Sequence, residues 1–200
     1  MKKSLILVPL MAALLCACGG NNSGTTSGST SGSTGSSTTQ PVGGAVVYDF
    51  SSLTGAKDPL DAAGLKSIFD SLASNTIIDE VTATEKVYNG NGSGGAHADK
   101  NGMLKFGTGK GNGSFTVTLA ASITKVTVKC HDFYAKSSDY PTGSNHIVVN
   151  GEDKACPYNE TGNPEDLVFN VSSTKTLTIE SKNTDSSKFG RFTMFKLTLE

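Results

Sequence analysis

The chain has very little of several residue types that define familiar protein classes. Its 200 residues include no tryptophan, one arginine and four cysteines, and its formal net charge is −1. A near-neutral chain lacks the dense basic surface that holds a domain to nucleic acid. Four cysteines are too few for a disulfide-dense miniprotein, and no apolar run reaches the roughly 20 residues of a membrane-spanning helix. Nucleic-acid binding, a disulfide scaffold and a helical membrane bundle are therefore excluded.

Residues 1–17 have the pattern of a bacterial export signal. Two lysines precede an apolar run that ends at Leu15, and this run is too short for a permanent anchor. The ending resembles a lipobox, in which Leu15, Ala17 and Cys18 occupy the three defining positions. The resemblance implies that Cys18 receives diacylglycerol and becomes the new N-terminus. We expect an exported protein anchored to the bacterial membrane and cell surface through Cys18, with a released protein as the alternative.

A flexible tether and one domain follow the signal. Residues 19–44 contain eight glycines, seven serines and six threonines and carry no charge, so residues 18–44 are expected to be a lipidated, disordered linker. The remaining 156 residues, 45–200, have the size of a single domain with one core.

Alternating hydrophobicity predicts β strands through most of this domain. Apolar and polar residues alternate with period two, which is typical of strands with one buried and one wet face. Many short strands joined by short connections favour an all-β, two-sheet antiparallel sandwich, with a closed barrel as the alternative. The expected strands lie at 45–50, 76–81, 85–88, 103–106, 113–119, 122–130, 167–171, 176–180 and 192–199.

Two local features complete the predicted fold. Asp58 followed by Pro59 predicts the N-cap and first residue of a single helix, whose apolar stripe includes Leu65 and Phe69. In the last strand, the apolar residues change phase, with Phe195 expected to point inward. A β-bulge near Met194 would reconcile the two phases.

Several short motifs resemble the jelly-roll, galactose-binding-like modules of bacterial surface proteins. They are YDFSSL at 48–53, KVYNG at 86–90, LKFG at 104–107, ITKV at 123–126, PYN at 157–159 and RFTMFKL at 191–197. The resemblance covers nearly all of residues 45–200. It implies a jelly-roll sandwich that often binds glycans, in some members beside a structural calcium ion. The chain departs from that pattern because it has no tryptophan platform and no matching calcium-binding set, so no cofactor is assigned and a calcium ion stays open.

Strand direction predicts which end of the sandwich carries the ligand site. Because antiparallel strands alternate in direction, every second connection lies at the same end, and this places the long connections 131–145, 158–165 and 181–190 together. The short reversals at 150–153 and 172–174 fall at the other end. Tyrosine rings cover the apolar face of a sugar while polar groups bond its hydroxyls. The predicted ligand-binding residues are Tyr134, Tyr140, Tyr158, Asn159, Asp132 and Lys136; the alternative is that the tyrosines only close the end of the sandwich.

The remaining chemical candidates are sparse. Cys130 and Cys156 either form a disulfide, which export permits, or stay as buried thiols. Arg191 either binds a carboxylate or sugar hydroxyls, or pairs with Asp185, and we favour the pair. We assign no catalytic residue, because neither a nucleophile with its base nor a set of three zinc ligands survives inspection.

The sequence therefore predicts a non-enzymatic lipoprotein that binds a glycan through loops at one end of a sandwich. The alternative is a protein-interaction, structural or adhesion lipoprotein without a sugar ligand. A hydrolase is the least supported class. The sequence leaves open the identity of the sugar, the oligomeric state and the membrane that holds the anchor.

Overall fold

The computed structural model of the chain describes residues 43–56, 58–90, 101–133 and 141–200. Its main elements are strands, with one α-helix and one short 3-10 helix. In chain order they are β1 (Val46–Asp49), η1 (Phe50–Ser52), α1 (Ala62–Leu72), β2 (Ile78–Glu85), β3 (Val87–Asn89), β4 (Leu104–Phe106), β5 (Ser114–Asp132), β6 (Asn145–Val149), β7 (Glu152–Ala155), β8 (Glu165–Asn183) and β9 (Phe192–Leu199). The expected all-β domain with one helix is confirmed.

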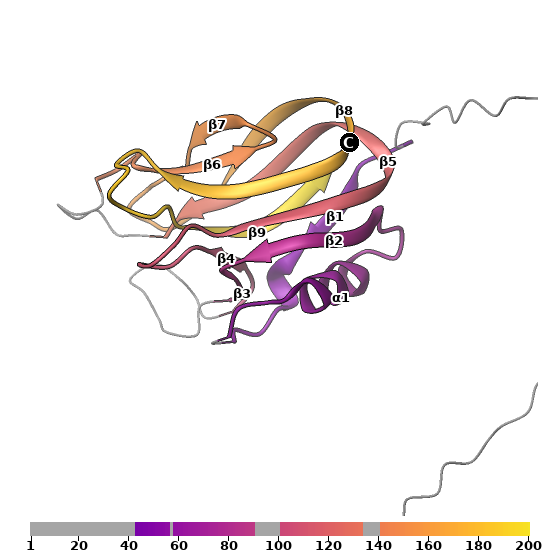
Figure 1. Ribbon diagram of the computed structural model, residues 1–200, viewed down its shortest axis with the longest axis horizontal. Helices are drawn as coiled ribbons and strands as arrows, with labels where there is room; N and C mark the ends of the chain where they lie inside the picture. The colour runs from indigo at the N-terminus through magenta and orange to yellow at the C-terminus, as the bar shows by residue number, and fades with distance from the viewer. Residues whose placement is uncertain (1–42, 57, 91–100, 134–140) are drawn as a thin grey trace, which may run out of the picture. The chain divides into compact units, whose positions relative to one another are not determined.

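All strand pairs are antiparallel, and two long bent strands join the two layers of the sandwich. The strands follow the order β3-β4-β9-β5-β8-β6-β7, while β1 also pairs with β9 and β2 with β5. Strands β5 and β8 have 19 residues each and curve back on themselves near the C-terminus (Figure 1). Inward-facing residues from both halves of β5, such as Phe115 and Val128, belong to one hydrophobic core. One continuous ladder therefore forms both layers.

The bends replace turns that we expected between separate strands. Residues 172–174 lie inside β8, where Thr174 pairs with Ile123 between two register shifts. The prediction of a tight turn between two separate strands at Ser172 and Ser173 is therefore wrong, although the chain does reverse its direction there. The physical reason is that a bent strand turns the chain over and still keeps its ladder, so no two-residue turn is needed. The predicted placement of the long connections still holds, because the first and last residues of a strand that folds back lie at the same end of the sandwich.

The long connections converge at this end, as the count predicted. Hydrogen bonds join them: Asp132 N–H donates to Pro157 O, Gly190 N–H to Asn112 Oδ1 and Thr184 N–H to Ser144 O. We call this end the loop pole and define it by residues 107–113, 131–133, 141–145, 156–164 and 184–191.

The opposite end, which we call the bend pole, consists of the bends at 120–124 and 172–174 and the turn at 150–151. The C-terminus lies there, since Glu200 O accepts from the N–H groups of Thr124 and Lys125. The first strand also begins there, because Val46 pairs with Leu199. The chain therefore enters the domain at the end opposite the loop pole.

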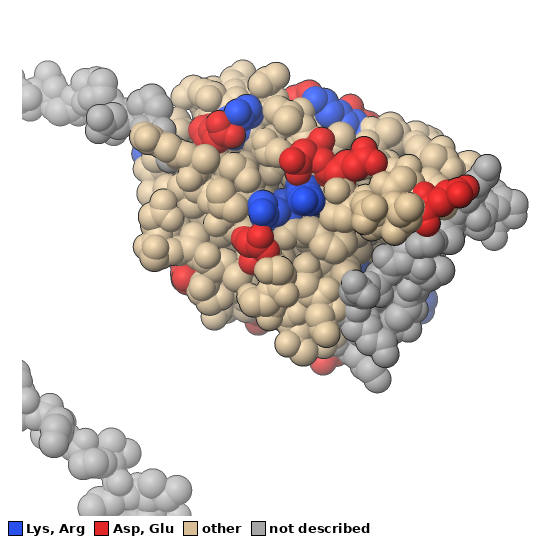
Figure 2. Space-filling view, turned by 180° about the vertical axis from the view of Figure 1, so that it is seen from behind, with Lys and Arg blue, Asp and Glu red and all other residues tan. Residues whose placement is uncertain are grey.

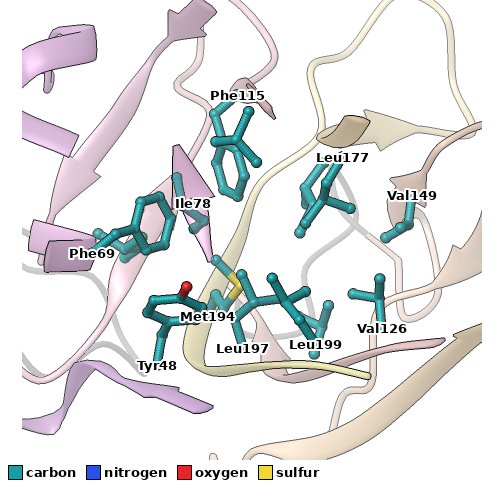
Figure 3. Packing of buried hydrophobic residues seen from close by; sticks show 14 of the residues in the cluster. Tyr48, Phe69, Ile78, Phe115, Val126, Val149, Leu177, Met194, Leu197 and Leu199 are labelled. Carbon is teal, nitrogen blue, oxygen red and sulfur yellow. The ribbon is translucent and has the colours of Figure 1, made fainter. Parts of the chain in front are cut away.

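Helix α1 lies along β2 and closes one side of the core (Figure 1). Phe69 on α1 packs edge-on against Tyr48 and Phe115, with ring centroids 5.1 and 5.7 Å apart (Figure 3). Tyr48 keeps its hydroxyl satisfied through Thr76 Oγ1 at 2.9 Å. These contacts fix α1 between the first strand and the long strand β5.

The start of α1 differs from the prediction. Asp61 is the N-cap and accepts from the Gly64 N–H at 2.7 Å, so the assignment of Asp58 as the cap and Pro59 as the first helical residue is wrong. Leu60 N–H donates to Val87 O, which keeps residues 59–60 extended beside β3. Pairing with a strand therefore outweighed the local Asp-Pro signal.

The predicted bulge in the last strand is present. The register between β5 and β9 shifts after Lys129, so that Cys130 lies opposite Met194. Met194 and Leu197 are both fully buried, whereas Phe195 is only half-buried. Phe195 is thus the extra residue of the bulge, and its expected inward orientation is wrong.

Candidate loop-pole binding site

Polar side chains are buried at the loop pole far more than elsewhere in the described domain. The buried polar residues are Ser122, His131, Asp132, Ser144, Asn145, Ser181, Asn183 and Thr193, and all except Ser122 lie at this pole or in strand ends beside it. Buried polar groups require hydrogen-bond partners, because water no longer supplies them. The loop pole therefore has an interior built from hydrogen bonds.

Asn145 is the centre of this polar interior. Its Nδ2 donates to Asp132 Oδ1 at 2.8 Å, and its Oδ1 accepts from Arg191 N–H at 2.9 Å and from Asn183 Nδ2 at 3.3 Å. One fully buried amide thus joins the end of β5, the start of β6, the end of β8 and the start of β9. The strand ends that carry the loops are held in a fixed relation by this residue.

Two glycines allow the loops to approach closely beside this amide. Gly107 has φ +78°, and a Cβ there would lie 2.1 Å from Gly190 O; a Cβ on Gly190 would lie 2.2 Å from the Lys182 backbone. Ser181 Oγ then donates to Gly190 O and accepts from Gly113 N–H. Side chains at these positions would push the 107–113 and 184–191 connections apart.

Tyr158 is the one predicted tyrosine that lies among the described residues. It is half-buried, and its ring centroid lies 5.8 Å from that of His131. His131 Nδ1 donates to Asp132 O, and its Nε2 accepts from Asn159 N–H. Since both ring nitrogens are engaged, the imidazole holds the connection that carries Tyr158 against the end of β5.

Asn159 and Asp132 have structural contacts that the sequence did not reveal. Asn159 bonds Thr161, Asn163 and Glu165 within its own turn. Asp132 is 3% exposed, and its carboxylate accepts from Asn145. In the structure this buried carboxylate braces the loops, and its role as a ligand contact stays a prediction. Tyr134, Lys136 and Tyr140 lie outside the described residues, as does Cys18.

Cys130 and Cys156 are free, buried thiols in the structure. They lie close together: burial raises the pKa of the Cys156 thiol, and a hydrogen bond with the Cys130 side chain raises it further. Of the two alternatives, the structure has the buried thiols. A raised pKa disfavours the Cys156 thiolate, which makes this thiol a poor nucleophile.

Basic and aromatic side chains form a second feature of the pole that the sequence analysis missed. Tyr88, Lys105, Thr193 and His131 lie in one cross-strand row over β3, β4, β9 and β5. The Lys105 ammonium lies 4.1 Å from the Tyr88 ring centroid, and Arg191 Cζ lies 5.8 Å from that of Phe133. Asp185, the expected partner of Arg191, accepts instead from Ser187 N–H and Oγ. Only the pairing of separate strands reveals this row, so no local signal could have found it.

Two histidines, His131 and His146, lie within the described ranges. The partners given above for His131 are backbone groups, and His146 contacts the Asp153 carboxylate and Gly143 O. No group of three His, Cys, Asp or Glu side chains in the described ranges is placed to hold a metal ion. No helix in the same ranges is long and apolar enough to cross a membrane. The calcium alternative stays a prediction.

Comparisons with known proteins add little. No family model and no curated protein matches the chain. A solved structure similar to it is described as a low-affinity xylan-binding module, CBM86, from the gut symbiont Roseburia intestinalis. The two are 14% identical, with a TM-score of 0.32 over 79% of this chain and 96% of that one. A likeness of this size carries no argument, so the β-sandwich rests on the strand pairing described above.

Proposed function

We propose that the protein is an exported, lipid-anchored module that binds a carbohydrate at the loop pole without catalysing a reaction. The observation that carries the proposal is the half-exposed Tyr158 ring, held beside His131 on loops that buried hydrogen bonds fix in place. An ordered ring of this kind offers an apolar face to a sugar at small entropic cost.

The position of the tether supports the same function. The chain enters the domain beside Leu199 at the bend pole, while Tyr158 lies at the loop pole. The chain that leads from Cys18 therefore joins the domain at the end opposite the loop pole. Such an attachment suits a module that reaches for a polysaccharide outside the cell.

A protein-interaction role is supported less well by the described surface. Its large exposed hydrophobic residues are Val47, Val168 and Phe189, each 38–42% exposed. Val47 and Val168 stand at the two ends of one cross-strand row, with Thr127 and Thr198 between them. The outward sheet face therefore lacks the contiguous apolar patch that marks many protein interfaces.

Affinity gel electrophoresis of the full chain in detergent, against a panel of neutral and acidic plant and bacterial polysaccharides, tests the proposal. We expect retardation by at least one polysaccharide, and Tyr158→Ala should weaken it about tenfold, because the aromatic contact is lost. Val47→Ala at the bend pole is the control and should bind normally. Tyr134→Ala and Tyr140→Ala test the two tyrosines that stay predictions. Unchanged binding in Tyr158→Ala would move the site away from this ring.

The anchor has a separate test. Metabolic labelling with a radioactive or clickable fatty acid should label the protein, and Cys18→Ala should abolish the label. Labelling that persists in Cys18→Ala, or that is absent from the unmodified protein, would contradict the anchor and leave the glycan site unaffected.

A further inference from the structure

Two cations and two aromatic rings meet where β3, β4 and β9 reach the loop pole. The Lys105 ammonium lies 4.1 Å from the Tyr88 ring centroid and 5.7 Å from that of Phe133. Arg191 Cζ lies 5.8 Å from the same Phe133 ring. One ring therefore lies within reach of both cations.

Lys105 lacks the acidic neighbour that most described lysines have. Lys66, Lys86, Lys125, Lys154, Lys182 and Lys196 each have a carboxylate oxygen within 4.0 Å. Lys105 has none among the described residues, although it is half-buried. Burial lowers the pKa of Lys105, and the charge of Arg191 lowers it further. A partly desolvated ammonium beside a guanidinium is stabilised when an anion arrives.

In a neighbouring row of the same sheet face, lysines lie beside aspartates, so that positive and negative charges balance. One row farther from the pole, Lys129 and Lys196 lie opposite each other, with Asp166 and Asp49 at the two ends of the row. Lys196 is paired with Asp49 at 3.2 Å. Figure 2 shows basic side chains with acidic ones beside them on one face of the molecule. Of these two rows, the one that contains Lys105 is the one with a net positive charge.

The backbone around Arg191 holds this cation in position. Asn145 Oδ1 accepts from Arg191 N–H, and the guanidinium passes directly beneath the 107–113 connection. A Cβ on Gly109 would lie 2.6 Å from Arg191 Nη2. The glycine at this position therefore allows the guanidinium to lie under the hairpin, where it adds positive potential beside Lys105.

From this geometry we infer that the loop pole recognises a carboxylate on its sugar, so that the substrate class is an acidic, uronate-containing polysaccharide. The Lys105 ammonium donates to the carboxylate, and the charge of Arg191 strengthens the attraction. Phe133 and Tyr88 exclude water around the pair and so reduce screening. This inference rests on the proposed glycan binding and assigns its specificity.

The test compares polygalacturonate with its methyl ester, which has the same sugar but no charge. Affinity electrophoresis of the full chain should give about tenfold tighter binding of the acid, since a charge-assisted hydrogen bond has roughly that effect. Lys105→Gln should remove the difference between the acid and the ester. Lys105→Arg should keep it, and Lys175→Gln, which removes an exposed charge at the bend of β8, is the matched control.

The outcomes separate this inference from the proposed function. Equal affinity for the acid and the ester, with binding that still depends on Tyr158, would overturn the recognition of a carboxylate. The proposed glycan binding would not be affected by that result. The carboxylate assignment would also fall if Lys175→Gln reduced the preference as much as Lys105→Gln. Absence of binding to every polysaccharide in the panel would overturn both proposals.

Discussion

Two regions of the domain core are built on different principles. Beneath α1, Tyr48, Phe69 and Phe115 form an aromatic cluster in which shape and apolar area determine the packing. At the loop pole, Asn145 and Asp132 are buried and joined by a directed hydrogen bond. Apolar packing tolerates small displacements, whereas hydrogen bonds fix distances and angles. The comparison teaches that the aromatic cluster stabilises the sandwich and that the polar interior of the loop pole positions its loops.

The largest expected effect on stability is in the aromatic cluster beneath α1. Phe69→Ala should lower the free energy of unfolding by about 3–5 kcal/mol, because it removes a buried ring and leaves a cavity. Urea denaturation measures this change, and Phe189→Ala at an exposed position is the control. A loss below that of the control would show that α1 does not close the core.

The next largest effect on stability should come from the polar interior of the loop pole, and it should be confined to the loops there. Asn145→Ala removes the hydrogen bonds from Asn145 to the Asp132 carboxylate and to the Arg191 N–H, which should cost about 2–3 kcal/mol. Hydrogen exchange should accelerate at residues 131–133 and 184–191 before it does so in β2. Asn170→Ala, on the exposed face of β8, is the matched control. Hydrogen exchange that accelerates uniformly throughout the domain would contradict the division between the aromatic cluster and the loop pole.

The two buried thiols test how tightly the core is closed to reagents. In the folded protein, iodoacetamide should react with Cys130 and Cys156 only as fast as the domain unfolds, because both are buried and the pKa of Cys156 is raised. Mass spectrometry of labelled protein measures the rate. If Cys130 and Cys156 stay unlabelled even in denaturant, the two residues form a disulfide and the prediction is contradicted.

The smallest effect should be on the sheet surface. The Ser51 N–H donates to Asp49 and holds the pKa of that carboxyl below its usual value of 3.8, with Lys196 contributing to the shift. The ionised Asp49 carboxylate therefore stabilises the fold fully above its usual pKa of 3.8. This stabilisation is lost as the pH falls through the lower, folded-state pKa. Asp49→Asn should cost only a few tenths of a kcal/mol, since the carboxyl is exposed. A flat difference between the variant and the parent across acidic pH would contradict this linkage.

The sequence predicted most of the strands because alternation along a chain is a local signal. Phe115, Val117 and Leu119 point inward as expected, and counting strand directions placed the long loops at one pole. Local signals misplaced the start of α1, since the contact between Leu60 and Val87 joins residues distant in the chain. The bend at 172–174 was also missed, because a bent strand and a turn have the same composition.

The site was harder to predict than the fold. Asp132 has the chemistry of a ligand contact, yet the partner that encloses it, Asn145, comes from another strand. Tyr88 and Lys105 meet only because β3 pairs with β4. Their neighbours are set by strand order, which hydrophobic alternation does not encode.

Hydrogen exchange of the full chain, with and without a bound polysaccharide, measures most directly whether the loop pole is the working end. Binding should slow exchange at residues 131–133, 156–164 and 184–191 and leave the bends at 120–124 and 172–174 unchanged. Protection confined to the bends, or to the outward face around Val47 and Val168, would contradict the assignment of the ligand to the loops.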